Sequence, residues 1–567
     1  MILSALSASA FTAVALASPV PPVELTDLAL GVQEMIARVT VDAAPGTWAP
    51  EYTWSSNPSQ RDFSSVRYQL AFMGYGVAAA AAAATPAHTG AASAILDDII
   101  GRMLDPAVWG IARASDWPNT TFNPADPVAY QNVMYSGHLA LLLVLYEGLT
   151  GDDKFAHAGF TFASFEGGAP AHYTTDSLVQ VLADQTATAP CGGIPCEPFQ
   201  VFTVCNQHSE AAKRGLVALR GSHSKTGEVA GSSRFLTFLR DNGTFPAGES
   251  QWLRAVYVQA QSQFPSNSPL PKVAAWAEGW WSQLSPNAGG WKPGIDAALG
   301  VASDAWTGAW MGMWTDEATS QEFVCNDGVR KLLANPAWQA AGNGSHLAAP
   351  GGSCFATVLA TQAIALCPSL ANGTERANAA QAYLQSHWGV WLPGDAYFLN
   401  TTGCDHSFGH PLLNTGVMLV GISGGALPLR QLLLDPPPPQ QQLHRLLEVQ
   451  VDDSASASGA WSVAVPAAHA DGHHLNFTLA GRGSLAAGDD GGSTAGTVTA
   501  VCELAASSAV VGGEAPHVTI VGWPHFRLTP SSWNATPGGG GRLNIALPGY
   551  VLHQQHDRRV RVVVNYG

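Results

Sequence analysis

The sequence predicts a mainly α-helical protein, with an α/α toroid over residues 24–430 followed by a β-sandwich-like domain over residues 443–567. Three observations lead to this prediction. Over the first region, apolar residues recur at helical spacing between Gly- and Pro-rich loops, with no βαβ rhythm and no simple repeat. Four consecutive prolines then mark a stiff linker over residues 435–442. The segments beyond the linker are short, β-rich and separated by Gly and Asp turns.

The composition supports a large buried core and argues against two classes of partner. Of the 567 residues, 46% are hydrophobic and only 12% are charged. The formal net charge is −16 and no basic run is present, so we expect the chain to bind neither nucleic acid nor an anionic membrane surface. Beyond the N-terminal segment we expect no apolar run of the ~18 residues that span a bilayer, and therefore no stable membrane insertion. The sequence leaves a homo-oligomer open.

Residues 1–17 are predicted to be a signal peptide, because they are small and apolar and end in the cleavage-like triplet Ala15-Leu16-Ala17. A buried first helix is the alternative, since Lys and Arg are missing from this segment. Glycosylation sequons support a secreted or secretory-pathway glycoprotein, and they begin at Asn119, Asn242, Asn343, Asn372, Asn400, Asn476 and Asn534. Eight cysteines fit an oxidising compartment, although their spacing does not assign pairs.

The helices of the first region are predicted from apolar spacing and from stop signals. Tyr68, Phe72 and Tyr75 are spaced to share one helical face. Gly148 is expected to stop the strongly apolar helix before it, and Asn206 is expected to cap the N-terminus of a later helix. The predicted helices cover residues 23–39, 92–104, 131–146 and 206–219, with further helices around Trp276, Trp310, Leu332, Ala363 and Ala379.

Two segments carry polar residues within apolar surroundings. In RDFSSVRYQLAF, Asp62 is expected in the loop before a helix and Tyr68 in its first turns, because residues six apart do not share a helical face. In YQNVMYSGHLALLL, Met134 and His138 are four apart and do share a face. Taken singly, each of these residues fits an ordinary structural role, such as a capping carboxylate, a core aromatic or a core histidine.

The third segment, CGGIPCEPFQVFTVCNQH, contains Cys196, Cys205 and His208. Cys205 directly precedes the expected helix N-terminus, where the helix dipole favours a thiolate. Spacing alone equally allows a Cys196–Cys205 disulfide. A metal site formed by both cysteines, His208 and His138 is a weaker alternative, because the tight Cys-x2-Cys pair of structural zinc sites is missing.

Together the three segments resemble linalool dehydratase/isomerase, a family of cofactor-free enzymes with an (α/α)6 barrel. The resemblance covers roughly residues 45–425. It implies free active-site cysteines instead of the disulfide, and a pocket with catalytic residues Asp62, Tyr68, His138, Cys196 and Cys205 and substrate-binding residues Met134 and Phe202. The β-rich domain, the sequons and the Ala-rich helix depart from the family, so the resemblance leaves the individual substrate undetermined.

The chemistry that this resemblance implies is hydro-lyase and isomerase chemistry on a terpene-like allylic tertiary alcohol or a related alkenol. Such a reaction needs an acid for the leaving hydroxyl, a base for a carbon-bound proton, and a dry pocket. No metal and no cofactor is implied, and the partner is a small hydrophobic alcohol or alkene. An allylic cation held by aromatic faces and a thioether formed by a cysteine remain equally open. Five tryptophans are candidates for pocket walls or for core packing, namely Trp276, Trp280, Trp306, Trp310 and Trp314.

Other classes of function remain as alternatives. A secreted carbohydrate-active α/α-toroid enzyme would need two facing carboxylates, for which Asp304, Asp316 and Glu317 are available. An inactive binding protein on the same fold and a Cys-His-Asp hydrolase are further alternatives. The segment TTGCDHSFGH, with Cys404, could supply metal ligands, a disulfide or a wall of the cavity.

Overall fold

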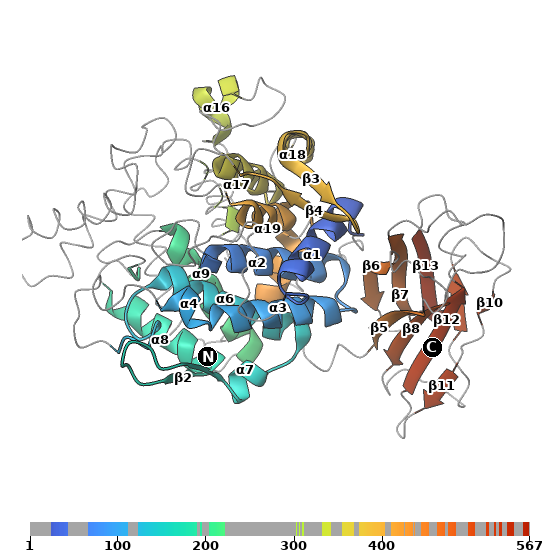
Figure 1. Ribbon diagram of the computed structural model, residues 1–567, viewed down its shortest axis with the longest axis horizontal. Helices are drawn as coiled ribbons and strands as arrows, with labels where there is room; N and C mark the ends of the chain where they lie inside the picture. The colour runs from blue at the N-terminus through green and yellow to red at the C-terminus, as the bar shows by residue number, and fades with distance from the viewer. Residues whose placement is uncertain are drawn as a thin grey trace, which may run out of the picture.

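The computed structural model contains a helical region followed by a β-rich region (Figure 1). It describes residues 24–43, 66–110, 123–189, 193–195, 203–221, 302, 306, 309–310, 332–341, 354–367, 373–402, 410–423, 426–434, 436, 444–452, 462–470, 474–482, 497–504, 517–520, 527–528, 532–535, 541–548 and 559–565.

The chain is mainly helical, as the sequence predicts, with sheets at its C-terminal end. The helices are α1 (Asp27–Val39), α2 (Val66–Ala84), α3 (Gly90–Met103), α4 (Pro106–Trp109), α6 (Val133–Thr150), α7 (Lys154–His157), α8 (Thr175–Thr188), α9 (Thr203–Arg220), α16 (Pro336–Ala341), α17 (Cys354–Ala365), α18 (Gly373–Trp388), α19 (Pro411–Ile422) and α20 (Ala426–Leu434). The first begins at Asp27, four residues later than predicted, because the Thr26 hydroxyl accepts a hydrogen bond from the Ala29 N–H at 3.2 Å.

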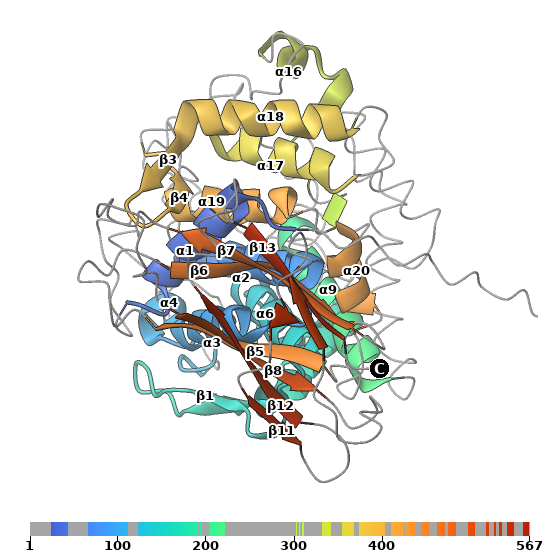
Figure 2. The same cartoon turned by 90° about the vertical axis from the view of Figure 1, so that its right-hand side faces the viewer.

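Helices α2 and α6 form the centre of one large hydrophobic cluster that extends to α17 and α19. The alanine-rich second half of α2 is buried on nearly all sides, because small side chains let neighbouring helices approach closely. In Figure 2, α17 and α18 lie side by side above α19. The described helices therefore pack around buried α2 and α6.

Helix α6 ends later than the sequence predicts. It continues through Gly148 to Thr150 and ends at Gly151, whose φ of 69° suits a glycine that follows a helix. A Cβ at Gly148 would lie 3.2 Å from Leu432 Cδ1, so a glycine at this position lets α20 pack closely against α6. The helix thus has 18 residues with a mean hydropathy of 1.3, enough by length and composition to cross a membrane, and 89% of it is buried inside the protein.

The start of α9 also differs from the prediction. The helix begins at Thr203, and Asn206 lies inside it instead of capping it. The Asn206 amide accepts from the Ile194 N–H at 2.7 Å and donates to the Ile194 carbonyl oxygen at 2.9 Å. The neighbouring Pro195 carbonyl accepts from the Val133 N–H at 3.2 Å. Residues 193–195 are therefore hydrogen-bonded to α9 through Asn206 and to the first turn of α6 through Val133.

Two short antiparallel hairpins interrupt the region that was expected to be helical. They are formed by β1 (Phe160–Phe162) with β2 (Ala171–Tyr173), and by β3 (Gly389–Leu392) with β4 (Ala396–Leu399). Strands of this length are too short to show a period in the sequence.

The C-terminal region consists of two antiparallel sheets. One has the strand order β10-β9-β13-β7-β6 and the other β11-β12-β8-β5. The strands are β5 (His444–Asp452), β6 (Ser462–Ala470), β7 (His474–Arg482), β8 (Thr497–Leu504), β9 (His517–Ile520), β10 (Arg527–Leu528), β11 (Ser532–Ala535), β12 (Gly541–Pro548) and β13 (Arg559–Asn565). Both sheets contribute to one hydrophobic cluster, to which Phe477, Cys502 and Val562 belong. This cluster is the core of the β-rich region.

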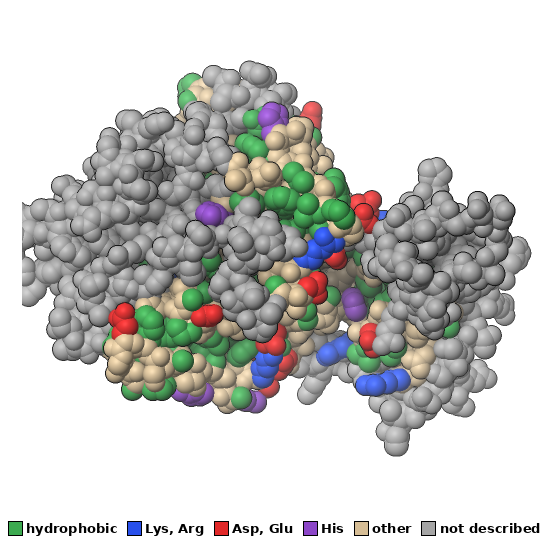
Figure 3. Space-filling model, viewed as in Figure 1, with side chains coloured by type: hydrophobic (Ala, Val, Ile, Leu, Met, Phe, Trp, Pro, Cys, Tyr) green, Lys and Arg blue, Asp and Glu red, His purple; other side chains and the backbone are tan. Residues whose placement is uncertain are grey.

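The β-rich region contacts the helical region through backbone and charged groups. Ala87 accepts from the Leu446 N–H at 2.9 Å and donates to the Ala468 carbonyl at 3.1 Å. Arg559 on β13 donates to the Glu24 and Asp27 carboxylates at 2.6 Å each. On the face in Figure 3, the described Lys and Arg side chains occur in small groups near acidic ones and form no continuous basic area.

Candidate functional site

The site lies where α2, α6 and α9 meet. A Cβ at Gly137 on α6 would lie 3.3 Å from the Ser209 backbone nitrogen on α9, so glycine permits a close approach of the two helices. This approach brings the imidazole rings of His138 and His208 to a centroid distance of 4.1 Å. Both side chains are buried, with exposed fractions of 2% and 1%.

Tyr68 and Met134 meet at the edge of this histidine pair. The Tyr68 hydroxyl lies 3.7 Å from Met134 Sδ, and the Tyr68 ring makes an edge contact with His138 at 5.4 Å between centroids. Arg67, only 1% exposed, donates from Nη2 to the same sulfur at 3.2 Å and lies 4.3 Å above the Tyr68 ring. Its Nε and Nη1 atoms have no hydrogen-bond partner within the described structure. A buried positive charge therefore borders the site.

Hydrogen bonding determines which nitrogen of His138 carries the proton. The Tyr75 hydroxyl lies 2.7 Å from His138 Nδ1, and Tyr75 is fully buried. Among the described residues Nδ1 is the single acceptor for this hydroxyl, so Tyr75 donates and the His138 proton resides on Nε2. His138 Nε2 is therefore a neutral N–H donor.

His208 has the opposite arrangement. Its Nδ1 lies 3.3 Å from the Cys205 carbonyl oxygen, which can only accept, so Nδ1 carries the proton. Its Nε2 is buried, unprotonated and without a hydrogen-bond partner in the described structure. The two histidines thus present one Nε2 donor and one Nε2 acceptor within the same cluster.

Aromatic rings form the rest of the described surroundings. Phe72 contacts both His138 and His208, and Trp306 and Trp310 stack on each other at 5.4 Å between centroids. Trp306 also lies 5.7 Å from the His208 ring. The indole N–H groups of both tryptophans have no partner in the described structure. We call Phe72, Tyr75, His138, His208, Trp306 and Trp310 the aromatic cluster.

Burial keeps the imidazoles neutral. Desolvation, followed by the nearby His208 and Arg67, lowers the pKa of His138 well below its usual value. Desolvation lowers the pKa of His208 to about 3, against the opposing effect of its bond to the Cys205 carbonyl. Desolvation raises the pKa of Tyr75 well above its usual value. At neutral pH all three groups are therefore uncharged.

These pKa shifts predict a loss of stability on acidification. Between pH 6.5 and about 3 the unfolded chain binds a proton at His208 that the folded chain does not, so the free energy of unfolding falls as the pH falls. At pH 5 the expected loss from His208 is about 2 kcal/mol relative to pH 7, at 1.36 kcal/mol per pKa unit. Urea unfolding of wild type and His208→Gln at both pH values measures it. An equal pH dependence in the two proteins would contradict the neutral buried state.

Some of the predicted site residues lie close together in the structure, and others are not among the residues that it describes. Tyr68 contacts both Met134 and His138, as described above. Cys205 is buried and free, three residues before His208 on α9. Asp62, Cys196 and Phe202 lie outside the described residues, and so do Trp276, Trp280, Trp314 and Cys404.

Sequence reasoning missed three residues of the site. Tyr75 was assigned only to a helical face, His208 only to a metal alternative, and Arg67 to no role. The face shared by Tyr68, Phe72 and Tyr75 held the information for Tyr75, since it turns toward His138. Among the described residues no group of three or more His, Cys, Asp or Glu side chains is placed to hold a metal ion.

Comparison with known proteins gives a family match for part of the chain. Residues 67–288 match the model of the linalool dehydratase/isomerase family. Among solved structures, the chain is similar to endoglucanase CelQ from Clostridium thermocellum complexed with cellotriose, with 11% identity, 95% of this chain and 92% of that chain covered, and a TM-score of 0.26. CelQ complexed with cellobiose and cellotriose gives 10% identity, the same coverage and a TM-score of 0.25. Structural likenesses at this level support no conclusion about activity. The matched segment contains most of α2 and all of α6 and α9, which carry the histidine pair.

Proposed function

We propose that the protein is a cofactor-free dehydratase/isomerase of a terpene-like allylic alcohol, on the premise that residues 67–288 match the model of the linalool dehydratase/isomerase family. The observation that carries the proposal is the pair of Nε2 atoms in the aromatic cluster, one a donor and one an acceptor. A hydroxyl group both donates and accepts. An alcohol oxygen that reached both Nε2 atoms would accept from His138 and donate to His208, whose Nε2 has no partner in the described structure.

The proposed reaction divides the work between binding and proton transfer. His138 donates a hydrogen bond from Nε2 to the hydroxyl oxygen, and this neutral donor stabilises the negative charge that develops as the C–O bond breaks. His208 accepts the hydroxyl proton in a hydrogen bond but does not remove it, because its pKa of about 3 makes it a weak base. The two histidines thus orient the substrate.

Proton transfer is assigned to the remaining predicted residues. An acid protonates the leaving hydroxyl, water departs, and a base removes a proton from the neighbouring carbon. We assign these roles to Asp62, Tyr68, Cys196 and Cys205. Of these, Tyr68 contacts His138, and Cys205 is a free cysteine in the first turn of α9, three residues before His208.

The surroundings support this chemistry. Met134 and Phe202 are proposed to contact the hydrophobic part of the substrate. The tryptophan faces offer stabilisation to an allylic cation, and the buried cluster excludes water. We further propose that the helices close into an (α/α)6 barrel, that the two C-terminal sheets form a sandwich, and that the protein is secreted and glycosylated.

The wild-type protein tests the proposal directly. We expect it to dehydrate or isomerise at least one tertiary allylic terpene alcohol, with products measured by gas chromatography and mass spectrometry. Since the proposal assigns no metal, EDTA should leave the rate unchanged. Turnover of oligosaccharides but of no alkenol by folded protein would overturn the proposal, and loss of alkenol turnover with EDTA would overturn the assignment of the site.

A further inference from the structure

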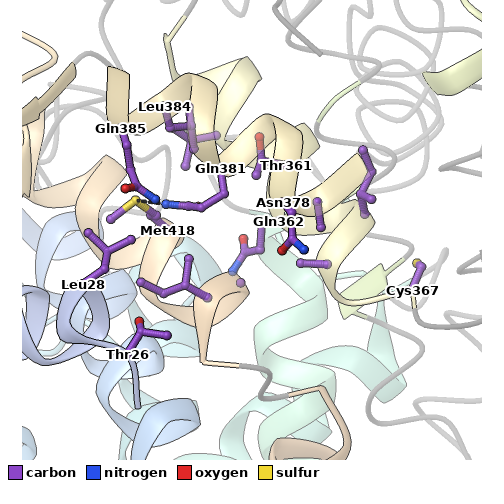
Figure 4. A pocket seen from close by; sticks show the side chains of 16 residues that line it. Thr26, Leu28, Thr361, Gln362, Cys367, Asn378, Gln381, Leu384, Gln385 and Met418 are labelled. Carbon is purple, nitrogen blue, oxygen red and sulfur yellow. Dashed lines mark hydrogen bonds between the residues drawn. The ribbon is translucent and has the colours of Figure 1, made fainter. Parts of the chain in front are cut away.

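A cavity lies between α17, α18, α19 and the start of α1, and it includes none of the residues of the aromatic cluster (Figure 4). Its volume is about 460 Å³, within the range of small-molecule sites. Of the three helices that form most of it, α17 packs on both α18 and α19. The cavity therefore has the size of a ligand site and is separate from the proposed active site.

Gln362 on α17 is the unusual residue in this cavity. It is 1% exposed, and neither Oε1 nor Nε2 has a hydrogen-bond partner in the described structure. Figure 4 shows its amide among the cavity-lining side chains. Burying an amide without partners costs about 1–3 kcal/mol, and most buried polar groups avoid this by finding a partner. A ligand that both donates and accepts would satisfy this amide.

The lining specifies the chemistry of that ligand. Its polar groups are neutral hydroxyls and amides, including Thr361, Asn378, Gln381 and Gln385, and its other side chains are aliphatic or sulfur-containing. None of the described residues that line the cavity is charged or aromatic. Among these residues a charged ligand would find no counter-charge, and a sugar or an aromatic ring would find no aromatic face to stack on. These features select an uncharged aliphatic molecule with one hydrogen-bonding head.

We propose that this cavity binds an uncharged aliphatic alcohol or primary amide, with its head on the Gln362 amide and its chain along the aliphatic wall. A primary amide offers both a donor and an acceptor, as Gln362 does, so two parallel hydrogen bonds form. Gln381 donates a hydrogen bond to Met418 Sδ at 3.2 Å. Because a thioether sulfur is a weak acceptor, a ligand oxygen can take its place. The site is independent of the alkenol chemistry proposed above.

Calorimetry with a matched set of probes tests the proposal. Octanamide and 1-octanol should bind wild-type protein at least tenfold more tightly than octanoate or octylammonium, which share the same chain. Gln362→Leu should weaken octanamide binding at least tenfold. The matched control Gln180→Leu changes an amide on α8 that bonds Asp184 at the surface, and it should bind octanamide as wild type does.

Two further measurements separate a binding role from a structural one. Gln362→Leu removes an unpaired buried amide, so the variant should unfold at or above the wild-type temperature, whereas a structural glutamine would make it less stable. At Gly421 a Cβ has ordinary contacts of 3.6 Å with Ala365 and Gln362, so Gly421→Leu should fill the cavity and also abolish binding. His138→Phe should bind octanamide normally. Equal binding of octanoate, undiminished binding by Gln362→Leu or Gly421→Leu, or lost binding by His138→Phe would overturn the proposal.

Discussion

His138→Phe should lower alkenol turnover by roughly 10²–10⁴-fold while the protein remains folded. Phenylalanine preserves a ring among Tyr68, Phe72 and His208 but removes the Nε2 donor and the acceptor for Tyr75. The loss should fall on kcat, because the donor stabilises charge that develops only in the transition state. Steady-state kinetics with the alcohol that wild type turns over best measures it.

A matched control and a double variant sharpen this prediction. His172→Phe alters an exposed histidine on the β1–β2 hairpin, which bonds Thr161, and should leave turnover unchanged. Cys205→Ser should also lose most activity, and the double variant with His138→Phe should lose far less than the product of the two effects, since residues of one site fail together. Full activity of His138→Phe, or an equal loss in His172→Phe, would refute the role assigned to His138.

Lys213→Met should destabilise the folded protein by about 3–5 kcal/mol. Lys213 and Glu210 on α9 are each 1% exposed and form a buried ion pair, and Lys213 also donates to the Thr186 hydroxyl at 2.9 Å. Removing the lysine leaves the Glu210 carboxylate buried without its counter-charge, and its Oε2 already has no partner in the described structure. Urea unfolding at pH 7 measures the change.

The surface pair between Lys154 and Asp97 provides the comparison. Its side chains are 39% and 46% exposed, so Lys154→Met should cost less than about 1 kcal/mol. Replacing both buried partners, with Lys213→Met and Glu210→Leu together, should restore much of the lost stability because no buried charge remains. A cost for Lys213→Met no larger than that for Lys154→Met would show that Glu210 finds another partner.

The contrast between local and distant interactions explains which sequence predictions succeed. Helical spacing placed Tyr68, Phe72 and Tyr75 on one face, and the structure has them on α2. Residue preferences for helix ends placed Gly148 and Asn206 at the ends of helices, and both predictions were wrong. Glycine at position 148 leaves room for Leu432, which packs against it, and the Asn206 amide is hydrogen-bonded to the Ile194 backbone. Neither partner is near in the sequence, so residue preferences alone could not reveal them.

The sequence by itself determined the mainly helical character and the proximity of Met134 to His138, because periodicity and motif spacing are local properties. Only the tertiary structure decided that His208 lies against His138, that Tyr75 places the His138 proton on Nε2, and that Gln362 is buried without a partner. The physical reason is that proton position, pKa and hydrogen-bond satisfaction depend on burial and on atoms contributed by other helices. Those atoms lie tens of residues away along the chain and meet only when α2, α6 and α9 pack.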